Sequence, residues 1–128
     1  MRWRAVSLLL LISVTAFAQE KQAPSNWITT KEGCRVWDAS PEPDETASWS
    51  GACNDGVASG SGVLQWYLNG KPGEHYEGEM LDGKYNGHGV MTWANGDHYD
   101  GGFKDGSKNG HGVYTWANGF HYEGDWPK

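Results

Sequence analysis

Five histidines are the side chains in this sequence that could most readily bind a metal ion. They form two groups whose neighbouring members are 23 residues apart, His75, His98 and His121 in one and His88 and His111 in the other. If each interval folds into two strands, equivalent histidines lie roughly 9.6 Å apart. Zinc ligands must all come within about 2.1 Å of one ion. The spacing therefore argues against a shared site, and we expect neither a metal nor a cofactor.

Acidic residues offer these histidines a structural role instead. The strand register predicted from side-chain alternation places Glu79 opposite His88, and His111 opposite Asp125, as cross-strand acid–imidazole pairs. The sequence contains no His-Glu-x-x-His or Gly-x-Ser-x-Gly motif, and no phosphate-cradling loop follows a predicted strand. The acidic residues recur at the interval of the histidines, as scaffold residues do, and no residue stands out as a break in the symmetry. We therefore expect a protein that is not an enzyme.

The chain begins with a segment typical of a secretory signal. Residues 1–18 combine two arginines, an apolar run and the small-x-small motif Ala16-Phe17-Ala18. Cleavage there would leave 8 Lys and Arg against 16 Asp and Glu, a net charge of 8 − 16 = −8. This charge disfavours nucleic acid as a partner. We expect an exported, periplasmic or secreted protein, with an uncleaved anchor as the alternative.

Two cysteines, Cys34 and Cys53, follow the predicted cleavage site. An even pair in an exported chain favours a disulfide, and two separate thiols are the alternative. Residues 19–48 would then form a lead-in with a strand near Cys34–Trp37 and a proline-containing loop over residues 39–45.

Residues 49–128 are built on a repeat. All 19 glycines and every tryptophan except Trp3 lie after residue 18, while aliphatic residues are sparse. Tyr-x-Gly recurs at residues 76–78, 99–101 and 122–124, and Trp-Ala-Asn-Gly recurs at residues 93–96 and 116–119. A fixed period of this kind indicates stacked structural units. Trp49-Ser-Gly51 begins a fainter earlier copy.

The pattern Tyr-x-Gly-x4-Gly-x3-Gly-x-Gly, at residues 76–89 and 99–112, resembles the MORN repeat, whose usual length is also 23. The likeness covers roughly residues 49–126, with Trp49 standing where tyrosine is expected. The lead-in around the cysteines is similar, more weakly, to that of some bacterial members. The resemblance implies a protein-binding, dimerising or positioning module, and some members are linked to phospholipids.

Alternation of side chains predicts the sheet independently of the family. Residues 76–80 and 87–93 alternate with period two, and Ala94-Asn95-Gly96 forms a three-residue loop that pairs Trp93 with Asp97. The result is an all-β fold, a single elongated twisted antiparallel sheet of about eight strands formed by stacked β-hairpins. One face would carry three rows: Tyr76, Met91, Tyr99, Tyr114, Tyr122; Gly78, Gly89, Gly101, Gly112, Gly124; and Met80, Gly87, Phe103, Gly110, Trp126. Rings would lie flat over the trough that the glycine row leaves.

This aromatic face is the candidate partner-binding surface, although the tyrosines could equally form the core. The site residues predicted are Trp66, Trp93, Trp116, Tyr76, Tyr99 and Tyr122. The tryptophans lie at strand ends beside turns, where we expect them to be half-exposed and spaced roughly 10 Å apart.

The expected partner is another protein, or a second copy of the chain paired through the edge strand His121 to Trp126. A lipid or glycan of the cell envelope is an alternative ligand. Scarce Lys and Arg near the aromatic rows disfavour anionic headgroups. A further alternative is an inhibitor or immunity-type protein for a basic exported enzyme, which the negative charge alone favours.

Overall fold

The computed structural model describes residues 25–127. The predicted signal segment, 1–18, lies outside these residues. No helix in the described part of the chain is long and apolar enough to cross a membrane.

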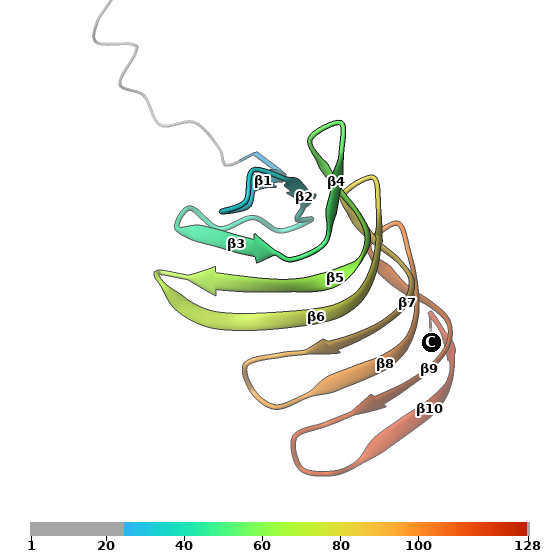
Figure 1. The fold of residues 1–128 in the computed structure, drawn as a ribbon. Coiled ribbons are helices and arrows are strands. Elements are labelled where there is room, and N and C mark those ends of the chain that lie inside the picture. Colours follow the sequence, from blue (N-terminus) through green and yellow to red (C-terminus); the bar gives the residue numbers. More distant parts are fainter. Residues whose placement is uncertain (1–24, 128) are drawn as a thin grey trace, which may run out of the picture.

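The described chain is all-β, as predicted, and forms one open sheet (Figure 1). Its strands are β1 (Trp27–Thr29), β2 (Arg35–Trp37), β3 (Glu45–Trp49), β4 (Ala52–Asn54), β5 (Val57–Leu68), β6 (Lys71–Leu81), β7 (Lys84–Thr92), β8 (His98–Lys104), β9 (Ser107–Thr115) and β10 (His121–Trp126). The order in space is β1-β2-β5-β6-β7-β8-β9-β10, and β3 and β4 also pair with β5. Two expectations were wrong: the sheet has 10 strands, and it is mixed because β2 runs parallel to β5 at Arg35 and Val57.

Two kinds of turn set the register of the repeats. The predicted three-residue loop is confirmed: Gly96 has a φ of 99°, and the Trp93 N–H donates to the Asp97 carbonyl at 2.8 Å. The opposite ends of the hairpins turn on Asp82-Gly83 and Asp105-Gly106, whose two successive positive φ angles match the twist of the flanking strands. Met91 consequently faces Tyr99, and Gly89 faces Gly101, as the alternation predicts.

The tyrosine and glycine rows are present in the predicted pairing. Tyr76 faces Met91, Tyr99 faces Tyr114, and the glycines pair in sequence from Gly78 to Gly124. A Cβ atom added to Gly89 would collide with the Tyr76 ring. In the earlier repeat the Trp49 ring does the same, since a Cβ on Gly62 would lie 2.7 Å from it. Each ring therefore occupies space that only glycine leaves open.

The third predicted row was wrong at two pairs. Met80 faces Tyr85 instead of Gly87, and Phe103 faces Lys108 instead of Gly110. The register shifts by a bulge after Gly78 and again after Gly101, opposite segments in which Gly87 and Gly110 have φ angles of 81° and 82°. Tyr85 and Lys108 lie on the aromatic face in step with Gly87 and Gly110, and the bulges set them opposite Met80 and Phe103.

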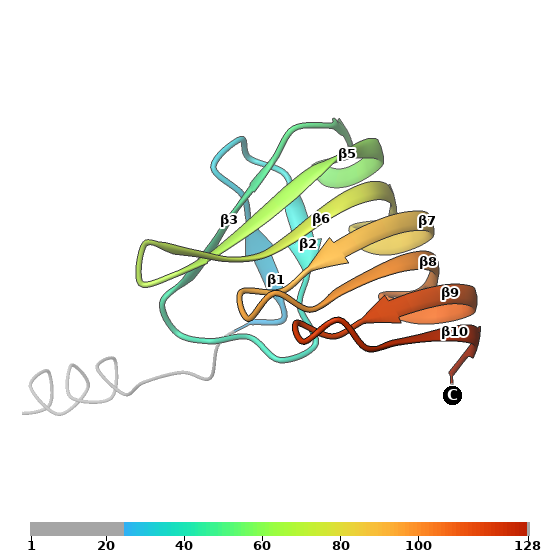
Figure 2. The ribbon, with the colours of Figure 1, turned by 90° about the horizontal axis from the view of Figure 1, so that it is seen from below.

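The lead-in folds back onto the repeats. The Trp37 N–H donates to the Gly83 carbonyl at 2.8 Å, and Val36 is completely buried. After β2, a loop of residues 38–44, here called the lead-in loop, returns the chain to β3 on the side of the aromatic face (Figure 2). The N-terminal part of the aromatic face is therefore covered by the same chain.

The predicted disulfide is confirmed. Cys34 and Cys53 are bonded, with their Cα atoms 5.8 Å apart, and connect the start of β2 to β4. The bond ties the lead-in to the first strands of the repeat region. A disulfide indicates an oxidising compartment.

Candidate functional site

The six predicted site residues divide sharply by exposure. Trp66, Tyr76 and Tyr99 are buried, with 4%, 0% and 0% of their surface exposed. Trp116 is 38% exposed, and Trp93 and Tyr122 are half-buried. The expectation of a half-exposed tryptophan was wrong for Trp66, and the alternative of a tyrosine core holds for Tyr76 and Tyr99.

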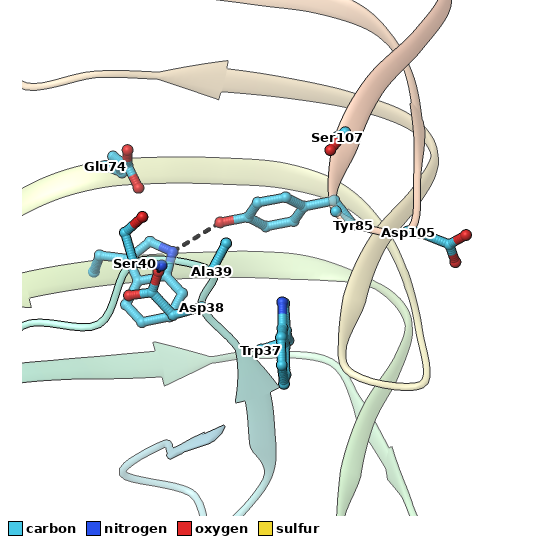
Figure 3. A pocket seen from close by; sticks show the side chains of 10 residues that line it. Trp37, Asp38, Ala39, Ser40, Glu74, Tyr85, Asp105 and Ser107 are labelled. Carbon is cyan, nitrogen blue, oxygen red and sulfur yellow. Dashed lines mark hydrogen bonds between the residues drawn. The ribbon is translucent and has the colours of Figure 1, made fainter. Parts of the chain in front are cut away.

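Trp66 is buried because two unpredicted neighbours cover it. Its Nε1–H donates to the Tyr85 hydroxyl at 2.8 Å (Figure 3). The Tyr85 ring packs against Tyr76 with centroids 4.3 Å apart. Burial raises the pKa of Tyr85 well above its usual range. On the other side, Asp38 and Ser40 of the lead-in loop line a cavity with Trp66. The bulge sets Tyr85 opposite Met80, a pairing that plain alternation did not predict.

The cavity between the lead-in loop and the hairpins has a volume of about 270 Å³ and is polar on one side. Asp38 and Glu74 project toward it beside Tyr85 (Figure 3). Burial raises the pKa of Glu74, although the indole of Trp93 donates a hydrogen bond to it. Burial, followed by a hydrogen bond with Asp38, raises the pKa of Glu45 to about 8. Three carboxyl groups thus meet where the lead-in loop contacts the sheet.

The Glu45 carboxyl makes a pH-dependent contribution to folding. Its pKa in the folded chain lies above its ordinary value of 4.5, so the folded state binds the proton more tightly. The resulting stability is fully present below about pH 4.5 and is lost as the pH rises through about 8. We expect Glu45→Gln to flatten the fall in unfolding free energy between pH 5 and pH 9, measured by urea denaturation. Glu42 is exposed, so Glu42→Gln should leave the pH dependence of the unfolding free energy as it is in the wild type. An equal effect of both variants would contradict the assignment to Glu45.

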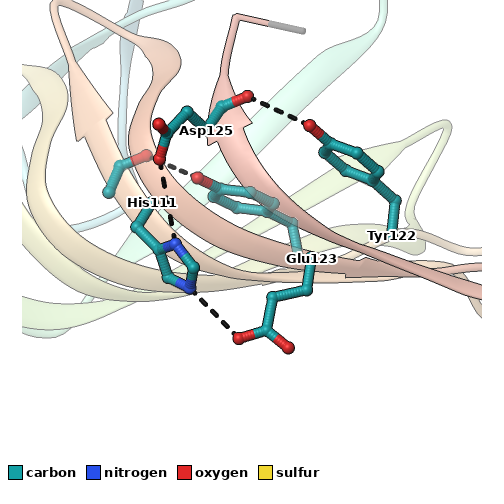
Figure 4. A network of polar contacts seen from close by, with 6 residues as sticks. His111, Tyr122, Glu123 and Asp125 are labelled. Carbon is teal, nitrogen blue, oxygen red and sulfur yellow. Dashed lines mark hydrogen bonds and ion pairs between the residues drawn. The ribbon is translucent and has the colours of Figure 1, made fainter.

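The histidines pair with acidic side chains on the opposite, wet face. His88 Nε2 lies 3.0 Å from Asp100. His111 lies 3.2 Å from Glu123 and 3.8 Å from Asp125 (Figure 4). The predicted pairing of His111 opposite Asp125 is confirmed. The predicted position of Glu79 opposite His88 was wrong, because the bulge after Gly78 removes Glu79 from the ladder. Within residues 25–127, no three His, Cys, Asp or Glu side chains are grouped so as to hold a metal ion.

A lysine lies inside the aromatic face at its C-terminal half. The Lys108 ammonium is 5.4–5.8 Å from four ring centroids, those of Trp93, Tyr99, Tyr114 and Trp126. The expectation that basic residues are scarce near the aromatic rows was wrong here, since Lys108 pairs with Phe103 on this face. Comparison with Tyr85, 23 residues earlier, would have marked Lys108 as a departure from the repeat.

The aromatic face ends in exposed rings beside β10. Trp116 packs against Tyr114 with centroids 4.8 Å apart, and its backbone N–H donates to the Phe120 carbonyl across the last loop. Phe120 is 74% exposed. It occupies the repeat position of Glu74 and Asp97, where the earlier repeats carry a carboxylate. We call Trp116 and Phe120 the open end.

Asp97 shows what the carboxylate does at that repeat position. It accepts hydrogen bonds from the Ala117 N–H at 2.8 Å and from the Tyr114 hydroxyl at 2.9 Å. Burial raises the pKa of Asp97, but these hydrogen bonds outweigh it and leave the pKa lowered. Asp97 thereby fastens its loop to the next one. Phe120 cannot accept such bonds, so the last loop presents an apolar ring instead.

Comparison with known proteins agrees with this geometry. The MORN repeat pattern matches residues 54–67, 76–98 and 99–120. A search of curated proteins found no relative of the chain. MORN repeats in general serve as protein- or membrane-interaction modules. The matched segments lie between the end of β4 and the last loop, within the sheet that carries the aromatic face.

Proposed function

We propose that this chain is an exported, non-catalytic interaction module that binds a partner protein through the open end of its aromatic face. The supporting observation is the unequal covering of that face. The lead-in and Tyr85 bury Trp66, whereas Trp116 and Phe120 remain 38% and 74% exposed. Exposed large aromatic side chains are enriched at the centres of protein interfaces.

The edge of the sheet supports the same location. β10 pairs with β9 along His121–Trp126, and no further described strand pairs with its other side. Such an edge can accept a strand from a partner or from a second copy of the chain. The open end and this edge are adjacent, because Phe120 directly precedes β10. A partner that adds a strand to β10 would thus also reach these rings.

Charge and compartment narrow the kind of partner. Without residues 1–18 the chain carries a net charge of −8, which favours a partner with a basic surface. The disulfide supports export to an oxidising compartment, either the periplasm or the exterior. Periodic acid–histidine pairs on the wet face support a scaffold role for the titratable groups there, in keeping with a protein that is not an enzyme.

The test removes the open end while keeping the fold. We expect Trp116→Ala with Phe120→Ala to reduce recovery of the partner by more than about tenfold, since central aromatic residues dominate binding energy. Recovery is measured by purifying the tagged full-length chain from its native cell envelope and quantifying bound proteins by mass spectrometry. Leu81→Ala is the matched control, because Leu81 is 53% exposed but lies at another turn.

The outcome is decided by the comparison of the two variants. Retained binding by Leu81→Ala with loss in the double variant supports the open end as the site. Equal recovery by the double variant and the wild type, with the thermal unfolding midpoint unchanged, would contradict the proposal. Recovery of no specific partner by the wild-type chain would contradict it as well.

A further inference from the structure

The ammonium of Lys108 lies over a cluster of four aromatic rings. Its nitrogen lies 5.4 Å from the Trp126 centroid, 5.5 Å from Trp93, 5.7 Å from Tyr114 and 5.8 Å from Tyr99. We call these four rings the cation box. A cation over an aromatic face is attracted by the ring quadrupole within about 6 Å of the centroid. All four rings of the box lie within this distance of the same Lys108 ammonium.

The box breaks the symmetry of the repeat. In the preceding repeat, Tyr85 occupies the position of Lys108, packs against Tyr76 and accepts the hydrogen bond from Trp66. An aromatic ring therefore fills this space in one repeat, and a flexible cation fills it in the next. A purely structural filler at residue 108 would be expected to repeat the tyrosine. In this repeat the rings thus meet a cation on a flexible side chain in place of a packed tyrosine.

The chemistry of the box suits a cation without N–H groups. The Lys108 ammonium carries three donors, yet it makes no hydrogen bond or ion pair with any residue from 25 to 127. Ring faces attract charge but are poor acceptors of N–H donors. A quaternary ammonium group has no donor to satisfy, and its methyl groups present the charge directly to the rings, as in known aromatic cages.

A carboxylate lies within electrostatic range of the box. Glu74 is held by the indole of Trp93, one wall of the box, and Lys108 acts on Glu74 by lowering its pKa against the larger effect of burial. Trp126 forms another wall and is itself partly buried against Tyr99 and Tyr114, with centroids 5.6 Å and 6.0 Å away. Rings and a nearby carboxylate together favour a positive ligand and disfavour an anionic one.

We propose that the cation box of Trp93, Tyr99, Tyr114 and Trp126 is a binding site for a quaternary ammonium group of the choline type, and that Lys108 occupies it internally until such a ligand replaces its ammonium. This site goes beyond the proposed partner binding, because it requires a small ligand and does not involve Phe120. Choline itself and a lipid that carries a choline headgroup share the recognised chemistry.

The experiment titrates the full-length protein with choline and follows tryptophan fluorescence and the choline methyl signal by saturation-transfer NMR. We expect Lys108→Met to bind choline at least about tenfold more tightly than the wild type, because the internal competitor is removed. Lys108→Gln should behave in the same way. Lys84→Met is the matched control, since Lys84 lies 5.0 Å from the single ring of Trp37, and it should leave choline affinity unchanged.

Two further arms identify the interaction and the source of the ligand. The uncharged isostere of choline, with a tert-butyl group in place of trimethylammonium, should not bind, and Trp126→Leu should abolish choline binding by Lys108→Met. Binding of free choline assigns a soluble ligand; binding only to phosphatidylcholine vesicles, and only with Trp126 present, assigns a lipid headgroup. Lack of choline and vesicle binding by both Lys108 variants, or equal binding of the uncharged isostere, would overturn the proposal.

Discussion

Replacing Tyr76 with alanine is expected to lower the free energy of unfolding by about 3–5 kcal/mol, the range for removing a large aromatic side chain from a core. Tyr76 has 0% exposure and contacts Tyr85 and Phe103, with ring centroids 4.3 Å and 5.3 Å away. Its hydroxyl donates to the Glu79 carbonyl at 2.6 Å, and burial raises its pKa to about 12. The substitution removes both the ring packing and this hydrogen bond.

The matched control for Tyr76 is Tyr122, which holds the same repeat position at the end of the sheet. Tyr122 is half-buried, and its hydroxyl lies 3.5 Å from the Asp125 carbonyl. We expect Tyr122→Ala to lower the free energy of unfolding by less than half as much as Tyr76→Ala, because Tyr122 is only half-buried whereas Tyr76 is fully buried. Urea denaturation at 25 °C measures both. Equal losses of unfolding free energy in the two variants would contradict the view that Tyr76 is a core residue and Tyr122 is not.

The second large effect on the free energy of unfolding is expected from adding a single methyl group at Gly89. Gly89→Ala is expected to lower the free energy of unfolding by about 1–3 kcal/mol, the usual cost of overpacking. The nearest neighbours of the added Cβ are all atoms of the Tyr76 ring. Gly73→Ala is the control, since its Cβ would meet only the Trp66 carbonyl at 3.9 Å. Urea denaturation should show little or no loss for Gly73→Ala, and a comparable loss in both variants would contradict the account.

The glycine row could be predicted from the sequence because two local rules agree. Alternation with period two puts Tyr76 and Gly78 on one face, and the three-residue loop ending at Gly96 carries that face into the next strand. A register shift of one residue would have placed the rings on the opposite face of the sheet, exposed to water. Comparison of the repeats predicted that Trp49 begins an earlier copy, and its ring lies over Gly62 as the tyrosines lie over their own glycines.

The bulges could not be predicted by the same rules. Gly87 fits the alternation of its strand, and only the folded backbone reveals its φ of 81°. The resulting shifts set Tyr85 opposite Met80 and Lys108 opposite Phe103. Tyr85 closes the core over Trp66, and Lys108 lies over the rings of the cation box. Local patterns report which side of a strand a residue takes, but they do not report which residue it faces beyond a bulge.

The covering of Trp66 depends on long-range contacts that no local pattern encodes. A lead-in strand was predicted near residues 34–37, and β2 lies there, but its parallel pairing with β5 and the path of the lead-in loop arise from tertiary packing. The open end was foreseen at Trp116 but missed at Phe120. Comparison of Phe120 with Glu74 and Asp97, its equivalents in earlier repeats, is the signal that could have found it.

A double-mutant cycle between Gly89→Ala and Tyr76→Ala tests most directly whether each ring occupies the space that a missing Cβ leaves. Unfolding free energies of the wild type, both single variants and the double variant are measured in urea, with sucrose added equally to keep the weakest variant folded. If the Tyr76 ring lies over Gly89, Gly89→Ala loses most of its cost once the ring is absent, giving a coupling of about 0.5–3 kcal/mol. Additive losses with no coupling would contradict the account.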